Sequence, residues 1–355
     1  MIAIAAGGTG GHIFPAIAVA QALTKKGQPV VFIGNKGGME EKVVQERGIP
    51  FYGIHSAGLV GKTTWGKFKG VFQMGLGLKE SLEVLRKKGV KLVLGMGSYT
   101  SVPVAVAAHI LGIDLIIHEQ NVIPGKANQF LSRWAKLACI SFEGSKEYLR
   151  GKCILTGNPI REEIIKAALL KGREHKEKKF TIFILGGSQG ARVINEAFCE
   201  AWAFLKKFKN ELYFIHQTGK LDYNRIKEFY SQERIPGEVH SFIKDVGDVY
   251  LKAKLVVARA GASTIAEITA MGLPAILIPF PGAVGHQFYN AQVLERAGAA
   301  WVIPQSRLSG RLLAEQIREL YCHTDLLETM SLNASKLGKP NAAQEIMKIV
   351  EESML

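Results

Sequence analysis

The stretch AAGGTGGHIFP, residues 5–15, contains four glycines and follows the short apolar run MIAIAA at the start of the chain. A helical stretch from Pro15 to Lys26 comes next, with His12 just before it. A strand that passes through glycines into a helix exposes unpaired backbone N–H groups, and glycine lets a ligand approach them closely. Such a turn suits a phosphate or another anionic group. We therefore predict a strand–loop–helix unit that holds an anionic ligand.

The second half of the chain repeats this pattern. TIFILGGSQGAR (181–192) resembles IAIAAGGTGGH (2–12), and in each half short β-rich runs alternate with helical stretches. This rhythm is typical of a parallel sheet with helices on both faces. The polar segment from Arg161 onward reads as a linker. We therefore predict an α/β protein of two Rossmann-like domains, residues 1–160 and 161–355, with an interdomain cleft and with the final helix able to pack back on the first domain.

Neither glycine loop is a dinucleotide-binding fingerprint. Ile13 stands where the third glycine would be, and the second strand ends FIGN (32–35) without an acidic residue for a ribose hydroxyl. The chain also lacks the phosphate-binding pattern G-x-x-x-x-G-K-[ST]. The loops therefore point to an anionic ligand other than a dinucleotide bound in that way.

Four other polar clusters stand near predicted strand ends or helix starts. Each has a simpler reading: HEQN could cap a loop, Arg259 could form a surface ion pair, and Gln287 could face solvent. Because the clusters recur through both halves, all of these simpler readings would have to hold at once if none of the clusters bound a ligand. We therefore favour a binding role for the clusters. The clusters are HEQN (118–121), GMGSYTSVP (95–103), RAGASTIAE (259–267) and GHQFYNAQ (285–292).

Charge and composition narrow the function classes. The net charge of +14 over 355 residues suggests a polyanionic partner: a nucleic acid, an anionic membrane surface or a phosphorylated substrate. No uncharged apolar run is long enough to span a membrane, and MIAIAA is too short for a signal peptide, so we expect a cytosolic protein. The four cysteines form no C-x-x-C pair and are predicted to be buried thiols.

Residues 59–88 mix apolar and basic side chains, which suits the interface of an anionic bilayer. The alternative is a helix packed on the core with a solvated basic face. The apolar residues are Trp65, Phe68, Val71, Phe72, Met74 and Leu76, and the basic residues are Lys62, Lys67, Lys69, Arg86, Lys87 and Lys88.

The chain as a whole resembles the MurG-type glycosyltransferases. The motifs that carry this resemblance are GGTGGHIFPA, HEQN, TGNPIR, GGSQGAR, RAGASTIAE and HQFYNA, in this order. The resemblance implies a GT-B fold and inverting transfer of N-acetylglucosamine from UDP-N-acetylglucosamine to a lipid-linked muramoyl-pentapeptide (lipid I), which yields lipid II for peptidoglycan. It also implies a peripheral enzyme on the cytoplasmic face of the bacterial cell membrane, with an acceptor-binding N-terminal and a donor-binding C-terminal domain.

Position by position, the resemblance also implies site residues. Two positions depart from the family pattern: Ser98 replaces a glycine, and Gly285 replaces an acidic or amide residue. The acceptor side is expected to include Tyr99, His118 and Asn128. The donor site is expected to include Thr9, Gly10, Gly11, Asn121, Arg161, Ser188, Ile243, Ala262, Ser263, Thr264, Ile265, Ala266, Glu267 and Gln287.

His12 is the predicted general base, because histidine titrates near neutral pH. The alternative is that His12 only orders the loop or binds acceptor phosphate. His118 and Glu119 adjoin on a strand, so only one of them should face the cleft easily. The chain contains no Asp-x-Asp. We therefore expect no metal and no cofactor, with Arg259 and helix N-termini stabilising the departing UDP.

Two competing functions remain at this point. The first is another GT-B enzyme that uses a UDP-sugar, either a transferase with a different acceptor or a UDP-sugar epimerase. The second is a nucleic-acid-binding protein that exploits the positive charge. The lysines are spread along the chain and no recognisable binding module is present, so we expect no nucleic-acid partner.

Overall fold

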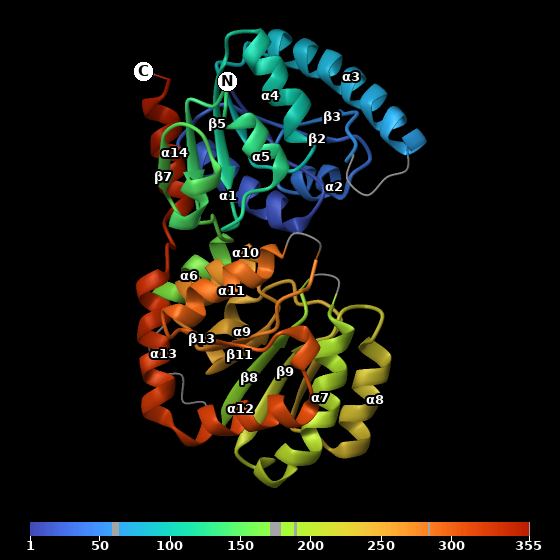
Figure 1. The fold of residues 1–355 in the computed structure, drawn as a ribbon, viewed down its shortest axis with the longest axis vertical. Helices are drawn as coiled ribbons and strands as arrows, with labels where there is room; N and C mark the ends of the chain where they lie inside the picture. The colour runs from blue at the N-terminus through green and yellow to red at the C-terminus, as the bar shows by residue number, and fades with distance from the viewer. Residues whose placement is uncertain (59–63, 171–178, 188–189, 283–284, 355) are drawn as a thin grey trace. The chain divides into compact units, whose positions relative to one another are not determined.

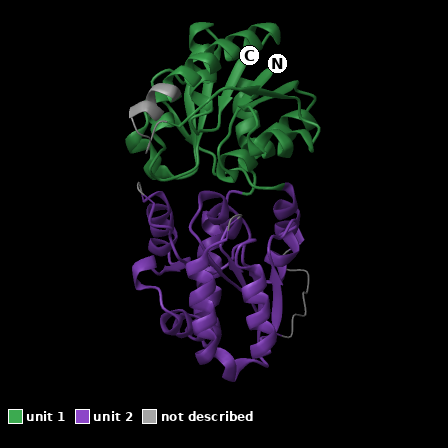
Figure 2. Ribbon diagram, turned by 90° about the vertical axis from the view of Figure 1, so that its right-hand side faces the viewer, with its two compact units in different colours: residues 1–161, 340–355 green, residues 162–339 purple. Residues whose placement is uncertain are grey.

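The computed structural model describes residues 1–58, 64–170, 179–187, 190–282 and 285–354, and for 64–69 the backbone alone. The chain forms two compact units (Figures 1 and 2). Unit 1 contains residues 1–161 and 340–355, and unit 2 contains residues 162–339. The division thus falls one residue after the expected boundary, and the last segment of the chain belongs to unit 1.

Unit 1 is built on a seven-stranded parallel sheet in the order β3-β2-β1-β4-β5-β6-β7. The strands are β1 (Ile2–Ala5), β2 (Val30–Asn35), β3 (Phe51–Ile54), β4 (Leu92–Gly95), β5 (Asp114–Glu119), β6 (Leu137–Ile140) and β7 (Cys153–Leu155). The helices are α1 (Gly10–Lys25), α2 (Met39–Gln45), α3 (Thr64–Lys87), α4 (Ser101–Ile110), α5 (Lys126–Leu131), the 3₁₀ turn η1 (Glu143–Tyr148) and α14 (Ala342–Glu352).

Unit 2 repeats the architecture with six parallel strands in the order β10-β9-β8-β11-β12-β13. The strands are β8 (Phe180–Leu185), β9 (Leu212–Gln217), β10 (Gly237–His240), β11 (Leu255–Ala258), β12 (Ala275–Leu277) and β13 (Ala300–Val302). The helices are α6 (Glu162–Leu170), α7 (Arg192–Leu205), η2 (Lys206–Phe208), α8 (Tyr223–Glu233), α9 (Gly247–Lys252), α10 (Ala262–Ala270), α11 (His286–Arg296), η3 (Gln305–Arg307), α12 (Gly310–Cys322) and α13 (Thr324–Leu337). The predicted α/β class with two parallel-sheet domains is confirmed.

Side chains of β1 alternate between two apolar clusters on the two faces of the unit 1 sheet. Ile2 and Ile4 join the cluster that contains α1 and α14, and Ala3 and Ala5 join the cluster that contains α4. This alternation follows from the period of two in a strand, so a strand buried on both faces is apolar throughout. Helices cover both faces of the sheet, as predicted.

Helix α1 begins earlier than expected, at Gly10 rather than at Pro15, so His12 lies in its first turn. Thr9 is extended and ends the loop, and its carbonyl accepts from the amides of His12 and Ile13. Pro15 lies inside this helix, where it has no N–H to donate to the carbonyl of Gly11, and the helix nevertheless continues to Lys25.

Two further expectations concern the cysteines and membrane-spanning helices. Cys139 is buried as predicted, but Cys153 and Cys199 are only partly buried and Cys322 is exposed at the end of α12. Within the described ranges, no helix is both long and apolar enough to cross a bilayer.

The packing of helix α14 on the core formed by the N-terminal strand and helix can be tested by mutation. Ile346 is fully buried against the core that contains Ile2 and α1. We expect Ile346→Ala to lower the free energy of unfolding by about 2–5 kcal/mol, because it leaves a cavity. The exposed neighbour Gln344 is the control, since Gln344→Ala should change this free energy by no more than about 0.5 kcal/mol. Urea unfolding measures both, and equal effects would contradict the packing.

Candidate functional site

The glycine loops of both units lie where the strand order reverses. In unit 1 the reversal falls between β1 and β4, and in unit 2 between β8 and β11. Each of these four strands is followed by a segment that the sequence singled out. In open parallel sheets, ligands bind outside the carboxyl ends of the strands at this switch point. The topology therefore places the predicted motifs at the edge of each sheet where ligands usually bind.

The loop after β1 requires glycine for steric reasons. A Cβ atom at Gly7 would lie 2.4 Å from Glu40 Oε1 and 2.6 Å from Thr100 Oγ1. Gly8 adopts a φ of 87°, a conformation that other residues rarely adopt. Thr9 and Gly11 remain exposed, and Gly10 is partly exposed. The loop thus presents its backbone to the solvent, as an anion-binding loop requires.

His12 is partly buried and is held by the loop after β4 and the end of β5. Its Nδ1 atom lies 3.1 Å from the Met96 carbonyl oxygen and 3.1 Å from Gln120 Oε1. Gly97 has a φ of 84°, and a Cβ atom there would lie 3.1 Å from His12 Nδ1. The glycine therefore leaves the space that the imidazole ring occupies.

His118, predicted to contact the acceptor, is fully buried. Its Nε2 atom lies 3.0 Å from the Gly157 carbonyl oxygen, and its Nδ1 atom lies 3.1 Å from Gln120 Nε2. Burial lowers the pKa of His118 to about 4, because the charged imidazolium is poorly solvated inside the protein. With this pKa His118 is neutral at pH 7, and it lies within the protein rather than on its surface.

Glu119 organises the loop that follows β5. Its carboxylate accepts hydrogen bonds from the amides of Asn121 (2.9 Å) and Gly125 (3.1 Å) and from Asn128 Nδ2 (2.8 Å). Glu119 is 1% exposed and His118 is fully buried, so both side chains lie inside unit 1, and the expectation that only one of them faces the cleft easily stays a prediction. Asn128 is also buried, and among the described residues its Oδ1 atom has no hydrogen-bond partner.

The loop after β4 contains one of the two departures from the family pattern. Ser98 has a φ of 71°, so serine stands in the left-handed conformation that glycine adopts more readily. The neighbouring Tyr99 ring lies against Gly8, where a Cβ atom would be 3.5 Å from Tyr99 Cε1. Burial, together with the nearby Glu40 carboxylate, raises the pKa of Tyr99.

Arg161, a predicted donor residue, is the last residue of the first segment of unit 1. Its guanidinium lies 5.9 Å from the centre of the Phe14 ring.

The loop after β8 is tightly packed against the loop after β9. A Cβ atom at Gly190 would lie 2.3 Å from the Thr218 carbonyl oxygen. Gln217 links the same two regions to the predicted donor residue Ile243. Its Nε2 atom donates to the Gly187 carbonyl (3.1 Å), and its Oε1 atom accepts from the Ile243 amide (2.9 Å). Ser188 lies outside the described residues.

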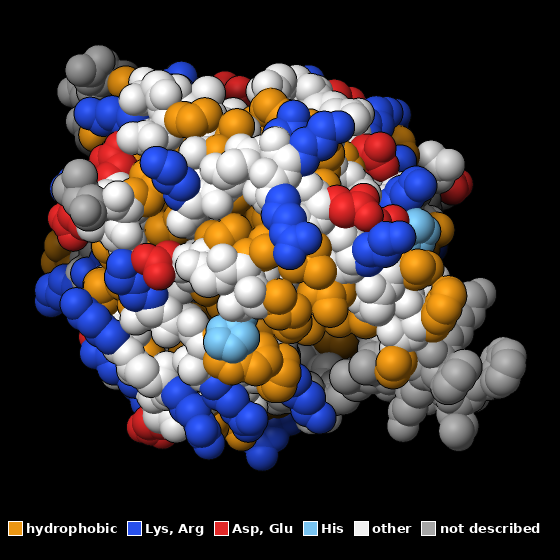
Figure 3. All heavy atoms as spheres, turned by 90° about the horizontal axis from the view of Figure 1, so that it is seen from above, with side chains coloured by type: hydrophobic (Ala, Val, Ile, Leu, Met, Phe, Trp, Pro, Cys, Tyr) orange, Lys and Arg blue, Asp and Glu red, His pale blue; other side chains and the backbone are white. Residues whose placement is uncertain are grey.

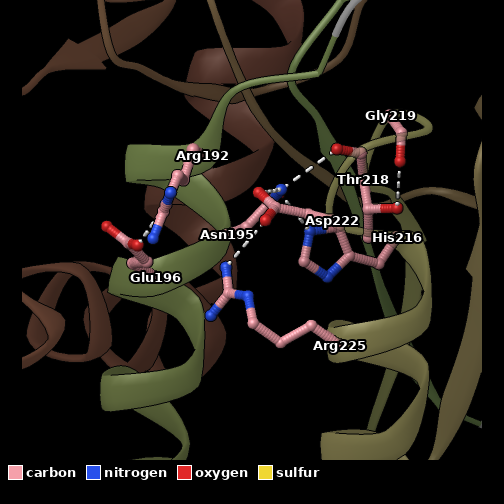
Figure 4. Close-up of polar contacts among 8 residues, drawn as sticks. All are labelled: Arg192, Asn195, Glu196, His216, Thr218, Gly219, Asp222 and Arg225. Atoms are coloured by element: carbon pink, nitrogen blue, oxygen red, sulfur yellow. Dashed lines mark hydrogen bonds and ion pairs between the residues drawn. The ribbon is translucent and has the colours of Figure 1, made fainter.

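A buried polar cluster fixes the loop after β9 to α7 (Figure 4). Asn195 Nδ2 donates to the Thr218 carbonyl (3.0 Å) and to Asp222 Oδ2 (2.8 Å), while His216 Nε2 lies 3.0 Å from Asn195 Oδ1. Burial lowers the pKa of His216 to about 3. Arg225 pairs with Asp222 at 3.1 Å.

His216, Gln217 and Asn195 were not among the residues predicted from sequence. A signal for two of them was present: His216 and Gln217 end β9, just as His118 and Glu119 of HEQN end β5. Polar residues at the carboxyl end of a buried parallel strand lie at the ligand-binding edge of the sheet.

Arg259 lies at the end of β11 and is held firmly in place. Its guanidinium donates to the Ile278 carbonyl (3.0 Å) and to Gln305 Oε1 (2.8 Å), and it lies 5.5 Å from the centre of the Phe280 ring. Partial burial lowers its pKa, but an arginine remains charged at neutral pH. A fixed cation at this edge of the sheet suits an anionic ligand.

Helix α10 begins directly after Arg259, Ala260 and Gly261. It carries the predicted donor residues Ala262, Ser263, Thr264, Ile265, Ala266 and Glu267. Ser263 Oγ is buried and has no hydrogen-bond partner among the described residues. Glu267 is 7% exposed and accepts from the Tyr250 hydroxyl at 3.0 Å.

Helix α11 carries Gln287 near its start. The Gln287 Oε1 atom accepts from the Phe280 amide at 2.9 Å, so this side chain shapes the loop before the helix. Gly285, the second departure from the family pattern, has a φ of 67°. Glycine relieves strain at that position, which gives a physical reason for its presence.

The packing of the β8 loop can be tested with two glycines. Gly187 and Gly190 both have positive φ angles (86° and 82°), so alanine at either position incurs a backbone strain of about 1–2 kcal/mol. Only at Gly190 would the new Cβ atom also meet the Thr218 carbonyl, since at Gly187 none of the described residues lies within 4 Å of the Cβ position. We expect Gly190→Ala to lower the free energy of unfolding in urea by clearly more than Gly187→Ala. Equal losses would refute the close packing.

The comparisons with known proteins agree on one family. The N-terminal domain model of glycosyltransferase family 28 matches residues 2–140, and the C-terminal domain model matches residues 181–346. A transferase of Syntrophus aciditrophicus is 40% identical and covers 98% of this chain and 96% of its own length. A transferase of Myxococcus xanthus is 39% identical, with coverages of 100% and 93%. Both are named UDP-N-acetylglucosamine–N-acetylmuramyl-(pentapeptide) pyrophosphoryl-undecaprenol N-acetylglucosamine transferase.

Solved structures give the same result. The crystal structure of Acinetobacter baumannii MurG has a TM-score of 0.83 and 31% identity, with 99% of each chain covered. A putative UDP-N-acetylglucosamine 2-epimerase from Listeria monocytogenes has a TM-score of 0.73 but only 15% identity, so it shows a shared fold alone. The GT-B fold implied by the sequence is confirmed. The chain belongs to glycosyltransferase family 28 and, within it, to the MurG-type N-acetylglucosamine transferases.

Proposed function

We propose that this protein transfers N-acetylglucosamine from UDP-N-acetylglucosamine to N-acetylmuramyl-pentapeptide pyrophosphoryl-undecaprenol (lipid I), which yields lipid II for the cell wall. The observation that carries the proposal is the 40% identity to the Syntrophus transferase over 98% of this chain. Both family 28 domains are present as well. No nucleic-acid partner is part of this function.

The two substrates are assigned to different units. UDP-N-acetylglucosamine binds mainly to unit 2, where Gln217 holds the Ile243 backbone beside the β8 loop and Arg259 supplies a cation. The acceptor binds mainly to unit 1, where the backbone of Thr9 and Gly11 is exposed and Tyr99 lies against the same loop. Exposed amides at a helix N-terminus suit the pyrophosphate of the lipid carrier.

His12 is the general base that takes the proton from the attacking acceptor hydroxyl. Its Nδ1 atom faces two oxygen atoms, Met96 O and Gln120 Oε1, so the ring is held at two points in the first turn of α1. A base held in this way keeps its ring in one orientation, which a proton transfer requires. The β-phosphate of the departing UDP gains negative charge, which Arg259 and the N-terminus of α10 stabilise.

The transfer reaction is tested with purified protein, radiolabelled UDP-N-acetylglucosamine and a short-chain lipid I analogue, with excess EDTA present. We expect labelled lipid II to form without added metal. Label that is never transferred to the lipid would refute the proposed reaction. Interconversion of the nucleotide sugar without acceptor would instead identify an epimerase, and a strict need for a divalent cation would refute the role given to Arg259 and α10.

His12→Ala separates the base from a purely structural histidine. We expect kcat to fall by about 10²–10⁴-fold, the usual contribution of a general base, while KM for UDP-N-acetylglucosamine stays within about twofold. His323→Ala is the matched control, because His323 is exposed and pairs only weakly with Glu319 at 3.6 Å. Near-wild-type turnover of His12→Ala at saturating substrate would leave His12 a loop-ordering or phosphate-binding role.

A peripheral location at the cytoplasmic face of the cell membrane is part of the proposal. Helix α3 exposes Val71 (60%), Phe72 (65%) and Leu76 (38%), and Arg86 and Lys87 are exposed at its end. Figure 3 shows hydrophobic side chains intermixed with Lys and Arg across one face of the molecule. Such a surface suits an anionic bilayer, where apolar side chains insert and cations meet the lipid headgroups. Of the predicted 59–88 segment, residues 59–63 and the side chains of 64–69 lie outside the described part.

Vesicle binding tests this surface. We expect binding to vesicles with anionic lipid to exceed binding to neutral vesicles and to weaken with salt. Phe72→Ala should weaken binding by about tenfold or more, because burying a phenylalanine side chain contributes about 1.5–3 kcal/mol. Leu332→Ala is the control, since Leu332 is 64% exposed on α13. Equal binding to neutral and anionic vesicles, or equal loss in both variants, would refute the surface.

A further inference from the structure

A chain of hydrogen bonds runs from the His12 ring to the Gly157 carbonyl, and its direction can be worked out atom by atom. His12 Nδ1 lies next to Gln120 Oε1, Gln120 Nε2 lies next to His118 Nδ1, and His118 Nε2 lies next to Gly157 O. The two carbonyl oxygens that touch the chain, Met96 O and Gly157 O, can only accept hydrogen bonds. They therefore fix which atoms must donate.

The Met96 carbonyl fixes the orientation of the Gln120 amide. The Gln120 nitrogen lies 2.8 Å from Met96 O. If the amide were turned around, two oxygen atoms would face each other at that distance, which is unfavourable. Gln120 Nε2 therefore donates one hydrogen to Met96 O and the other to His118 Nδ1, and Gln120 Oε1 is left to accept.

This orientation fixes a different tautomer at each histidine. His12 Nδ1 faces two acceptors at 3.1 Å, Met96 O and Gln120 Oε1, so it carries a hydrogen, and the lone pair of the neutral ring is on Nε2. His118 must donate from Nε2 to Gly157 O and accept at Nδ1, so its hydrogen is on Nε2. The two rings are thus opposite tautomers.

We propose that Gln120 and His118 are positioning residues that fix the tautomer and ring orientation of His12, so that its Nε2 lone pair receives the proton of the acceptor hydroxyl. This inference rests on the proposed role of His12 as the base. In the structure Gln120 is 1% exposed and His118 is fully buried, so both act through His12 rather than on substrate. An isolated neutral histidine prefers the Nε2–H tautomer, and these contacts reverse that preference at His12.

The tautomers are read directly by ¹⁵N NMR of the full-length protein labelled at its nine histidines, in the absence of substrate. Spectra of His12→Ala and His118→Phe assign the two residues. We expect a protonated Nδ1 at His12 and a protonated Nε2 at His118. The same tautomer at both residues, or a protonated Nδ1 at His118, would overturn the proposed chain. This measurement does not depend on whether the enzyme transfers sugar.

Kinetics then test whether the chain serves the reaction. Gln120→Met keeps the length of the side chain but removes both hydrogen-bonding functions. Gln120→Glu keeps an acceptor toward His12 but turns an oxygen toward Met96 O and toward His118 Nδ1. We expect each variant to lower kcat at least tenfold, with KM for UDP-N-acetylglucosamine within twofold of the wild type. The His12 signal should also lose its single Nδ1–H form in Gln120→Met.

Ser132→Ala is the control for loss of any buried hydrogen bond in unit 1. Ser132 is 2% exposed and its hydroxyl donates to the Gln129 carbonyl at 2.9 Å, and this variant should keep kcat within twofold. Thermal unfolding verifies that each variant is folded. If a Gln120 variant is not folded, His118→Phe is used in its place in the kinetic test.

A wild-type kcat in folded Gln120→Met and Gln120→Glu would overturn the positioning inference but not the proposed function. Absence of transfer by the wild type would instead overturn the proposed function.

Discussion

Missing side chains at a few glycines determine how the loops of this protein approach one another. Gly7 lies against Glu40 and Thr100, Gly97 lies against the His12 ring, and Gly190 lies against the Thr218 carbonyl. In each case a Cβ atom would come within about 3 Å of its neighbour, closer than ordinary van der Waals contact. The loops at the switch points can therefore pack closely, and Thr9 and Gly11 in the loop after β1 remain exposed.

Much of this arrangement could be predicted from sequence. The repeat of an apolar run, a glycine loop and a helix gave the two parallel-sheet units, because strand and helix periods are local properties. The start of α1 could not be found in that way, since glycines before Pro15 are poor helix formers. Gly97 leaves room for the His12 ring in the first turn of α1, and this contact joins residues that are far apart in the chain.

The candidate site residues also divide into those whose position a local sequence motif predicts and those whose position depends on distant contacts. Arg259 directly follows β11 and α10 begins at Ala262, so the predicted strand end and helix start are confirmed, while donor binding at this edge stays a prediction. His118 also lies at the carboxyl end of a strand, but it is fully buried, and strand alternation alone does not predict that burial. Gln217 and Asn195 were missed for a related reason: each acts by fixing a backbone carbonyl or amide, and such a role leaves little trace in one sequence. Ser98 shows the opposite case, where a predicted misfit is visible as a positive φ.

The course of the chain has a consequence for how the protein is made. Unit 1 takes residues from both ends of the chain, with α14 covering the apolar side of α1. A ribosome finishes all of unit 2 before it adds this last helix. Until then the nascent first domain lacks the α14 side chains that complete the apolar cluster shared with α1. Unit 2, by contrast, is one uninterrupted segment that can complete its core earlier. The order of synthesis thus makes the second domain the first that can finish folding.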